Sequence, residues 1–192
     1  GGHNVVAVSI CLPVYNGERF IAAALESALN QTFADFELIV VDDASTDRSF
    51  EIMQGYADRD TRIRLFRNEH NAGLFQNYNR CLKEARGDYI KPFAQDDLLA
   101  PSILQRQVQV LAQKPNVGLV STAKRWISET GETLQTVRTF NCDTTVSGRE
   151  VIRYNLIRLT NWVGEPSTVM YRAALGDNGF DTDLFHYGDI DY

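Results

Sequence analysis

The 192-residue sequence predicts a single α/β domain with a mostly parallel sheet flanked by helices. Three observations lead to this fold class. Apolar stretches of strand length alternate with helical patterns four times within the first 120 residues. After that point the pattern changes to a hairpin and shorter elements. Two pairs of adjacent carboxylates, Asp42–Asp43 and Asp96–Asp97, each follow an apolar stretch. Ligand-binding residues of open parallel sheets occupy such positions, at the carboxyl ends of the strands.

The elements of the first half follow from hydrophobic periodicity and from residues that start or stop helices and strands. Pro13 is expected to end the first strand, and Gly87 to end the third helix. Ser45 or Thr46 suits the cap of the second helix. The expected strands are 5–12, 37–41, 62–66, 89–93 and 117–121, and the expected helices are 18–31, the one after Thr46, 74–86 and 101–113.

The second half is expected to be smaller and mixed. Strands 124–127 and 133–138 flank a turn and predict a hairpin. Residues 147–150 form a capping box before a helix that runs through 156, and 167–171 predict another strand. Since no repeat or linker is visible, we expect residues 1–192 to form one domain with halves 5–121 and 122–192. The chain stops at Tyr192 without a closing helix, so we expect it to continue in the full-length protein.

Composition narrows the function classes. A net charge of −6 argues against a nucleic-acid-binding surface. No apolar run is long enough to cross a bilayer, and the sequence begins with no visible signal peptide. Cys11, Cys81 and Cys142 are widely spaced and form neither a CxxC pair nor a disulfide framework. A reducing, cytoplasmic location is therefore expected.

The acidic pairs predict a metal-assisted site. In open parallel sheets ligands bind outside the carboxyl ends of the strands, where residues 13–17, Asp42–Asp43 and Asp96–Asp97 would gather. Carboxylates held close together repel one another unless a cation lies between them. Mg²⁺ and Mn²⁺ prefer oxygen ligands and often complete their shell with phosphate oxygens. We therefore expect one carboxylate to hold a divalent metal that in turn holds a diphosphate.

Other nucleotide and metal motifs are absent from the sequence. It contains no G-x-x-x-x-G-K-[ST], no G-x-G-x-x-G after the first strand and no H-E-x-x-H. These absences argue against P-loop enzymes, dinucleotide dehydrogenases and zinc proteases.

The ordered set of motifs resembles family 2 glycosyltransferases, which have the GT-A fold. Each motif is weak alone, but the set covers nearly the whole chain. The matching segments are 8–18, 27–33, 37–47, 71–74 with Asn79, 85–90, 95–97, 164–167 and 188–189.

The resemblance implies a GT-A fold, with a Rossmann-like sheet in a nucleotide-sugar-binding half and a smaller mixed acceptor-side half. It implies transfer of a sugar from a nucleotide-diphosphate donor, UDP by family preference, to an acceptor hydroxyl. Pro13 and Tyr15 would contact the nucleoside, and Asp43 would accept a hydrogen bond from the base. Asp96 would lie by the ribose and diphosphate, and Asp97 would bind Mn²⁺ or Mg²⁺.

By the same resemblance, Asp189 is the general base of an inverting transfer. Asp191 is the alternative for that role. Many relatives carry an acid where this chain has Ala94, which leaves the number of metal contacts open. The acceptor would be a glycan, a lipid-linked sugar or another hydroxyl, as in polysaccharide, cell-wall or glycoconjugate synthesis. The protein would act in the cytoplasm or at the inner face of the membrane.

Two other functions stay open at this point. Ala94 and the end of the chain at Tyr192 are compatible with a module that binds nucleotide sugars without turnover. A nucleotidyltransferase would need a basic, glycine-rich loop after the first strand, yet that loop has no lysine or arginine before Arg19. Each acidic pair could also have a structural role alone, in capping a helix or forming a turn.

Overall fold

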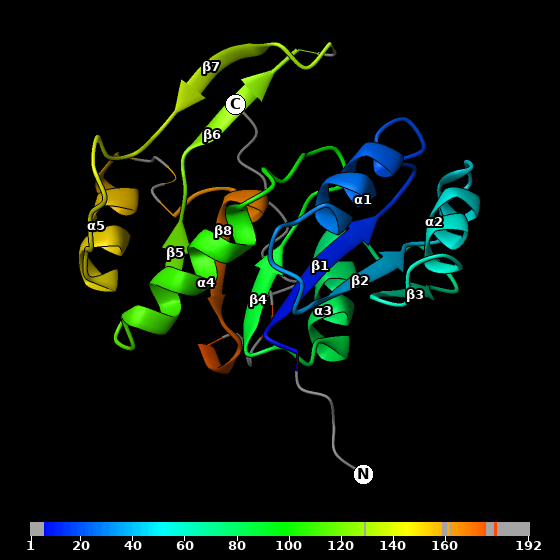
Figure 1. The fold of residues 1–192 in the computed structure, drawn as a ribbon, viewed down its shortest axis with the longest axis horizontal. Coiled ribbons are helices and arrows are strands. Elements are labelled where there is room, and N and C mark those ends of the chain that lie inside the picture. Colours follow the sequence, from blue (N-terminus) through cyan, green and yellow to red (C-terminus); the bar gives the residue numbers. More distant parts are fainter. Residues whose placement is uncertain (1–5, 129, 159–160, 162, 176–178, 180–192) are drawn as a thin grey trace.

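The computed structural model of the chain describes residues 6–128, 130–158, 161, 163–175 and 179 (Figure 1). The strands are β1 (Val8–Val14), β2 (Phe36–Asp42), β3 (Ile63–Arg67), β4 (Tyr89–Pro92), β5 (Leu119–Ser121), β6 (Lys124–Ile127), β7 (Thr133–Val137) and β8 (Val169–Arg172). The helices are α1 (Ile21–Leu29), α2 (Ser49–Ala57), α3 (Leu74–Glu84), α4 (Ile103–Gln113) and α5 (Gly148–Arg158), with short 3₁₀ turns η1 (Pro166–Thr168) and η2 (Ala173–Leu175).

A six-stranded sheet forms the centre of the molecule, in the order β3-β2-β1-β4-β8-β5. Strands β3, β2, β1 and β4 are parallel, which confirms the predicted α/β class. The strand–helix alternation predicts that β5 continues this parallel set. Strand β5 does run in the same direction as β4, but the two are not neighbours, because β8, from the second half of the sequence, lies between them and pairs antiparallel with both. The second half therefore completes the sheet beside β4.

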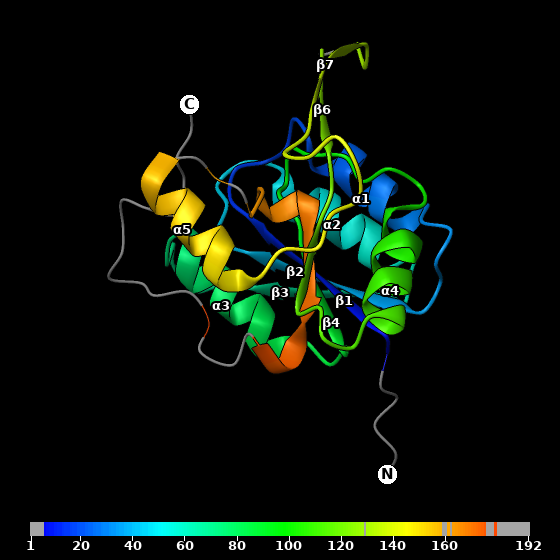
Figure 2. The same ribbon diagram turned by 90° about the vertical axis from the view of Figure 1, so that its left-hand side faces the viewer.

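Helices cover both faces of the sheet (Figure 2). One face packs against apolar side chains of α1, α2 and α4 and forms the larger core. The opposite face packs against α3 and includes the buried thiols Cys11 and Cys81. Strands β1 and β2 are buried along their whole length, so their sequences are mostly apolar, with Ser9, Glu37 and Asp42 as buried polar exceptions.

The first strand begins and ends later in the chain than predicted, and its neighbour explains the later end. Pro13 was expected to end the strand at Leu12, yet β1 continues to Val14 and pairs with β2 throughout. Cys11 O accepts a hydrogen bond from Phe93 N, so the backbone groups of Cys11 and Pro13 face the β4 side. Since β4 ends at Pro92, the missing N–H of Pro13 costs no ladder hydrogen bond.

The predicted cap of the second helix is wrong. Helix α2 begins at Ser49 without a side-chain hydrogen bond from its N-cap residue, Arg48. Ser45 Oγ and Thr46 N instead hydrogen bond to Asn16. Asp47 lies just before the helix, and its carboxylate accepts a hydrogen bond from Ser49 N at 2.9 Å.

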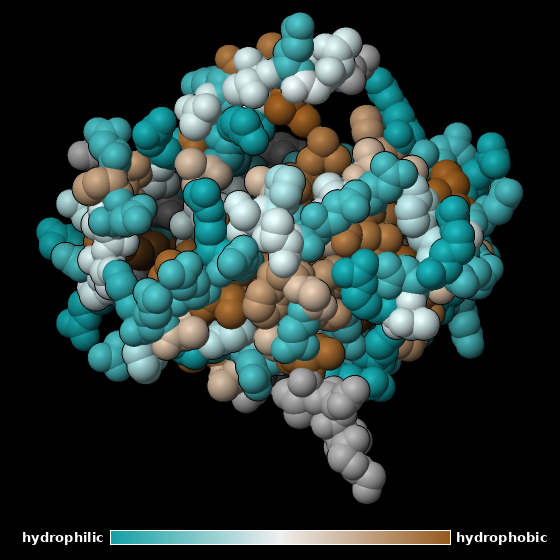
Figure 3. Space-filling model, viewed as in Figure 1, coloured by the Kyte–Doolittle hydropathy of each residue, from teal (hydrophilic) through white to brown (hydrophobic). Residues whose placement is uncertain are grey.

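The second half contains the predicted hairpin and capped helix. Strands β6 and β7 pair antiparallel and extend away from the main sheet (Figures 1 and 2). Ser147 and Glu150 exchange the two hydrogen bonds of the predicted capping box at the start of α5. The face shown in Figure 3 is mostly hydrophilic, with small scattered hydrophobic areas. Among the described helices, none has the length and apolar content needed to cross a membrane.

Candidate functional site

Three parallel strands end side by side at one edge of the sheet. Strand β1 lies between β2 and β4, so the loop after β1 lies between the segments that carry Asp42–Asp43 and Asp96–Asp97. The order of the strands therefore brings the two acidic pairs to the same edge, as the predicted parallel sheet requires. This edge is the general ligand-binding position of open α/β sheets.

Hydrogen bonds join the loop after β1 to the loop after β2. Asn16 N donates to Ser45 Oγ at 3.0 Å, and Thr46 N donates back to Asn16 Oδ1 at 2.9 Å. Gly17 N donates to Ser49 Oγ at 2.8 Å. Asn16 has a φ of 49°, in the left-handed region that asparagine tolerates better than most residues. The two loops thus form one connected surface.

The loop after β1 is also joined to the loop after β4. Tyr15 N donates to Gln95 Oε1 at 2.9 Å, and Gln95 Nε2 donates to Tyr15 O at 3.1 Å. A Cβ atom at Gly17 would lie 2.9 Å from Gln95 Cδ, so a larger residue here would displace the glutamine amide from its present position. Tyr15 is 45% exposed, which leaves its ring accessible to a ligand. Pro13, by contrast, is buried within β1.

Asp43 is buried and accepts three hydrogen bonds from the protein. Its Oδ1 accepts from Asn68 Nδ2 at 2.6 Å and from Ala72 N at 2.9 Å, and its Oδ2 accepts from Gly73 N at 2.9 Å. The carboxylate therefore holds the loop before α3 in place. A carboxylate has about four acceptor positions, so Oδ2 has capacity for one further donor.

Asp42 has a structural role. Its fully buried carboxylate pairs with Arg67 Nε at 3.0 Å and lies 3.3 Å from the N–H of Ser45. Arg67 also donates to Ser45 O at 3.1 Å. Asp42 and Arg67 together fix the turn after β2, but Asp42 does not cap α2, which begins four residues after Ser45.

Asp96 and Asp97 differ in their surroundings. Asp96 is exposed, whereas Asp97 is partly buried. Burial raises the pKa of Asp97, and the nearby carboxylates of Asp96 and Glu165 raise it further. A hydrogen bond from the Ser167 hydroxyl and the charge of Lys124 act in the opposite direction. Asp97 is therefore a carboxylate whose charge is poorly compensated by the protein alone.

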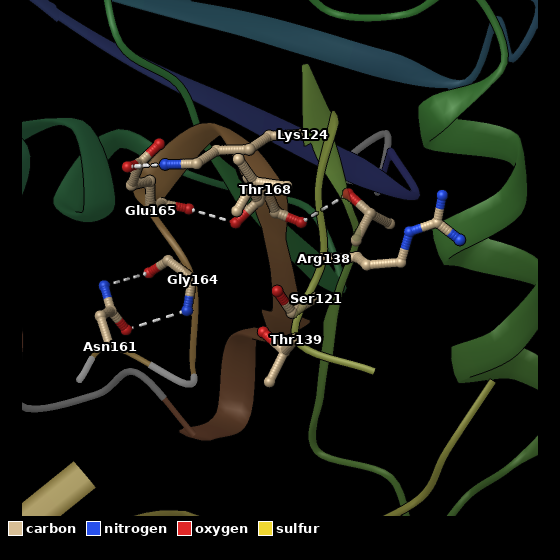
Figure 4. A pocket seen from close by; sticks show the side chains of 10 residues that line it. Ser121, Lys124, Arg138, Thr139, Asn161, Gly164, Glu165 and Thr168 are labelled. Atoms are coloured by element: carbon tan, nitrogen blue, oxygen red, sulfur yellow. Dashed lines mark hydrogen bonds and ion pairs between the residues drawn. The ribbon is translucent and has the colours of Figure 1, made fainter. Parts of the chain in front are cut away.

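A polar pocket of about 140 Å³ is lined mostly by residues of the second half of the chain (Figure 4). Two of its lining residues, Lys124 and Glu165, lie close enough to Asp97 to affect the pKa of that carboxyl. Lys124 and Glu165 form an ion pair with each other at this pocket. Lys124 Nζ also lies 5.6 Å from the centroid of the Trp126 ring. The pocket is lined by hydroxyl, amide and charged side chains: Ser121, Thr122, Lys124, Val137, Arg138, Thr139, Asn161, Gly164, Glu165 and Thr168.

The donor set at this edge fits a divalent cation that shares its shell with a ligand. Among the described residues, no three histidine, cysteine or acidic side chains are grouped closely enough to hold a metal by themselves. Mg²⁺ and similar ions, however, are commonly held by one or two carboxylates together with substrate phosphates. Asp97 offers a partly buried oxygen ligand in a locally negative environment. A cation there would offset the repulsion from Asp96 and Glu165.

Asp189 and Asp191, the residues predicted to act as base, lie outside the described residues. Sequence reasoning missed Gln95, which joins two loops of the site, and the buried Lys91 of the adjacent strand β4. Gln95 carries no sequence signal, because its contacts are to backbone atoms distant in the chain. Lys91 did carry one, since a lysine inside a strand that is otherwise apolar and doubly covered is unusual.

Comparison with known proteins gives a family match over most of the chain. The profile of the family described as Glycosyl transferase family 2 matches residues 9–177. An uncharacterized protein of Mycobacterium tuberculosis is 34% identical over 195 residues, covering 96% of this chain and 60% of that protein. Chondroitin synthase of Escherichia coli is 34% identical over 127 residues, covering 66% of this chain and 18% of that protein.

Solved structures show the same fold. S. aureus TarS in complex with UDP-GlcNAc has a TM-score of 0.70 and 25% identity, with 90% of this chain and 47% of that chain covered. A Pyrobaculum calidifontis mannosyltransferase in complex with GDP-Man and Mn²⁺ has a TM-score of 0.68 and 23% identity, with coverage of 94% and 49%. This chain thus spans only part of the length of the relatives it matches.

Proposed function

The chain belongs to glycosyl transferase family 2, and we propose that it transfers a sugar from a nucleotide-diphosphate donor to an acceptor hydroxyl, with inversion at the anomeric carbon. The observation that carries this proposal is the connection of three loops at one sheet edge. Gln95 joins Tyr15 to the loop of Asp97, and Asn16 joins the same surface to the loop after β2. An exposed aromatic ring and a partly buried carboxylate are thereby held on one surface.

In this proposal Tyr15 packs against the base of the donor, and Asp43 accepts a hydrogen bond from it. The free capacity of Asp43 Oδ2 is consistent with that role. Pro13 would contribute only the edge of its ring, because it is buried. UDP is the preferred donor nucleotide, a choice supported by the likeness to a protein solved with UDP-GlcNAc.

Asp96 and Asp97 face the diphosphate in the proposed complex. Asp97 would hold Mn²⁺ or Mg²⁺, and Asp96, being exposed, would lie by the ribose and diphosphate. The bound cation would offset negative charge on the departing nucleotide diphosphate. Ala94 stands where many relatives carry a further acid, so Asp97 would be the main protein ligand.

The polar pocket that contains Lys124 and Glu165 is the proposed entry for the acceptor. Its hydroxyl and amide groups suit a sugar ring, which presents hydroxyls in several directions. The acceptor oxygen forms a bond to the anomeric carbon while the bond from that carbon to the diphosphate breaks. The electron pair leaves with the diphosphate, and Asp189 takes the proton of the acceptor hydroxyl. The acceptor would be a glycan or a lipid-linked sugar in polysaccharide or glycoconjugate synthesis, at the cytoplasmic face of the membrane.

The test is release of the nucleotide diphosphate from UDP-sugars, measured with Mn²⁺ and with EDTA. The proposal expects release that depends on metal and accelerates with a suitable acceptor. Metal-dependent donor binding without release, to water or to any of a panel of saccharide acceptors, would favour a binding module instead. Ala94 is the specific feature that favours that alternative. Release of inorganic pyrophosphate from nucleoside triphosphates would favour a nucleotidyltransferase.

A further inference from the structure

Lys91 is a buried charged residue that the proposed reaction does not use. It lies in β4 beside Ile10 of β1, its side chain is fully buried, and burial lowers its pKa. Within the described part of the chain, no carboxylate forms an ion pair with it. Its Nζ donates instead to Ser167 O at 2.6 Å and to Val169 O at 3.1 Å. A buried charge without a paired carboxylate is costly, so this position needs a reason beyond packing.

The segment that Lys91 contacts is held by hydrogen bonds at three successive carbonyls. Between the two carbonyls bound by Lys91, Thr168 O accepts from the buried Gln107 Nε2 at 2.8 Å and from Thr122 N at 3.1 Å. This segment joins η1 to β8 and comes from the second half of the chain. Side chains of β4 and α4 therefore fix its position against the first half.

The side chain of Ser167 connects this fixed segment to the loop of Asp97. Its Oγ accepts a hydrogen bond from Ala94 N at 3.0 Å. The same hydroxyl lies close enough to the Asp97 carboxylate to lower the pKa of Asp97. Hydrogen bonds thus run from Lys91 Nζ through Ser167 to Ala94 in the loop of Asp97, and the Ser167 hydroxyl acts on the Asp97 carboxylate itself.

We propose that Lys91 and Ser167 act together as positioning residues for Asp97. Lys91 fixes the backbone of Ser167, and the Ser167 hydroxyl then orients the Asp97 carboxylate toward the metal and diphosphate. The inference rests on the proposed function, because it assigns the purpose of the orientation to metal-dependent donor binding. It extends that function by making a residue of the acceptor-side half part of the donor-side metal site.

The chemistry of metal sites supports this arrangement. Groups that hydrogen bond to a ligating carboxylate fix its direction, and replacing them typically costs about 10–100-fold in metal affinity. A hydroxyl that accepts from a backbone N–H has its own proton free to point at the carboxylate. Ser167 is in that situation, since Ala94 N occupies one acceptor position of its oxygen.

The experiment is a double-mutant cycle on the metal dependence of UDP binding. The UDP dissociation constant is measured by calorimetry with Mn²⁺ and with EDTA for the wild type, Lys91→Met, Ser167→Ala and the double variant. The ratio of the two constants isolates the metal contribution. We expect each single variant to reduce this ratio by about tenfold or more, with binding in EDTA unchanged. The reduction of this ratio in the double variant should be no greater than the larger of the two single-variant reductions, because both residues act through one chain of contacts.

Two further variants make the result decisive. Ser167→Thr keeps the hydroxyl and should retain most of the metal dependence of UDP binding. The comparison of Ser167→Ala with Ser167→Thr tests the inference even if Lys91→Met does not fold. Ser9→Ala removes a buried serine hydroxyl that bonds to Glu37 at the opposite end of β1, and should leave the ratio unchanged. The inference would be overturned if folded Ser167→Ala or Lys91→Met kept the wild-type ratio of dissociation constants. It would also be overturned if the reductions of the two single variants multiplied in the double variant. Wild-type protein that binds no UDP in either condition would overturn the proposed function, and this inference with it.

Discussion

The side chain of Gln95 and the backbone of Tyr15 form two hydrogen bonds in opposite directions, at 2.9 and 3.1 Å. A primary amide can accept from an N–H through its oxygen and donate to a carbonyl of the same residue through its nitrogen. Gln95 directly precedes Asp96, so this pair joins the proposed nucleoside contact to the proposed metal loop. The position of the Tyr15 ring therefore depends on a residue 80 positions away.

Replacing Gln95 with alanine should weaken nucleotide binding more than it weakens the fold. Each hydrogen bond contributes about 0.5–1.5 kcal/mol net, so losing both should raise the UDP dissociation constant by about tenfold. The measurement is calorimetry with Mn²⁺ present. Gln54→Ala is the matched control, since Gln54 makes a single exposed side-chain hydrogen bond on α2. An unchanged UDP affinity in Gln95→Ala would show that the pair does not organise the site.

The parallel part of the fold was predictable because short stretches of sequence are enough to identify its strands and helices. The apolar run from Leu38 to Val41 is recognisable without knowledge of its neighbours, since both faces of β2 are covered. The capping box of Ser147 and Glu150 was visible for the same reason, being contained within four residues. Such features need no long-range information.

What the sequence could not show is contact between distant segments. The antiparallel insertion of β8 between β4 and β5 depends on the path of the whole second half. The bond between Ser167 and the loop of Asp97 spans 73 positions at Ala94, and no local pattern encodes it. The extension of β1 through Pro13 likewise depends on where β4 ends, which is a property of the neighbouring strand.

Asp97 should destabilise the apo protein at neutral pH. Its pKa is raised in the folded state, chiefly by burial, so ionisation costs more folded than unfolded. The resulting loss in the free energy of unfolding is fully present above the folded-state pKa of Asp97. It disappears as the pH falls below the unfolded-state pKa. Asp97→Asn should therefore raise the melting temperature in EDTA at pH 7, by about 2–4 °C for each kcal/mol relieved in a chain of this size.

The same variant should lose the stabilisation that metal and nucleotide provide together. At 100 times the dissociation constant, a ligand adds about 2.7 kcal/mol, which corresponds to about 5–10 °C here. Thermal shifts with UDP and Mn²⁺ measure this difference. Asp35→Asn, an exposed site before the opposite end of β2, is the control and should keep the shift. A full ligand shift in Asp97→Asn would remove Asp97 as the metal ligand.

The buried Lys91 should give the stability of the fold a second pH dependence, with a sign opposite to that of Asp97. Burial lowers its pKa from 10.5 to about 7, so the folded state binds fewer protons than the unfolded state between these values. The stability of the wild type should rise across this interval by up to about 1.4 kcal/mol per pH unit. Lys91→Met should lack that rise in urea unfolding measured from pH 7 to pH 10. Lys83→Met, at an exposed lysine of α3, should keep the wild-type slope. Parallel slopes in wild type and Lys91→Met would contradict the lowered pKa.

Asp189→Asn should separate donor binding from transfer. The carboxylate is expected to accept the proton of the acceptor hydroxyl as that oxygen attacks, and an amide of the same shape cannot do so. Loss of a general base typically slows a reaction by about 10²–10⁴-fold, whereas the UDP-sugar dissociation constant should be unchanged. Product formation and calorimetry on the same preparations measure both quantities. Asp191→Asn is the matched variant two residues away, and should transfer at close to the wild-type rate. If Asp191→Asn is inactive and Asp189→Asn is active, the base is Asp191; if both transfer normally, neither residue takes the proton.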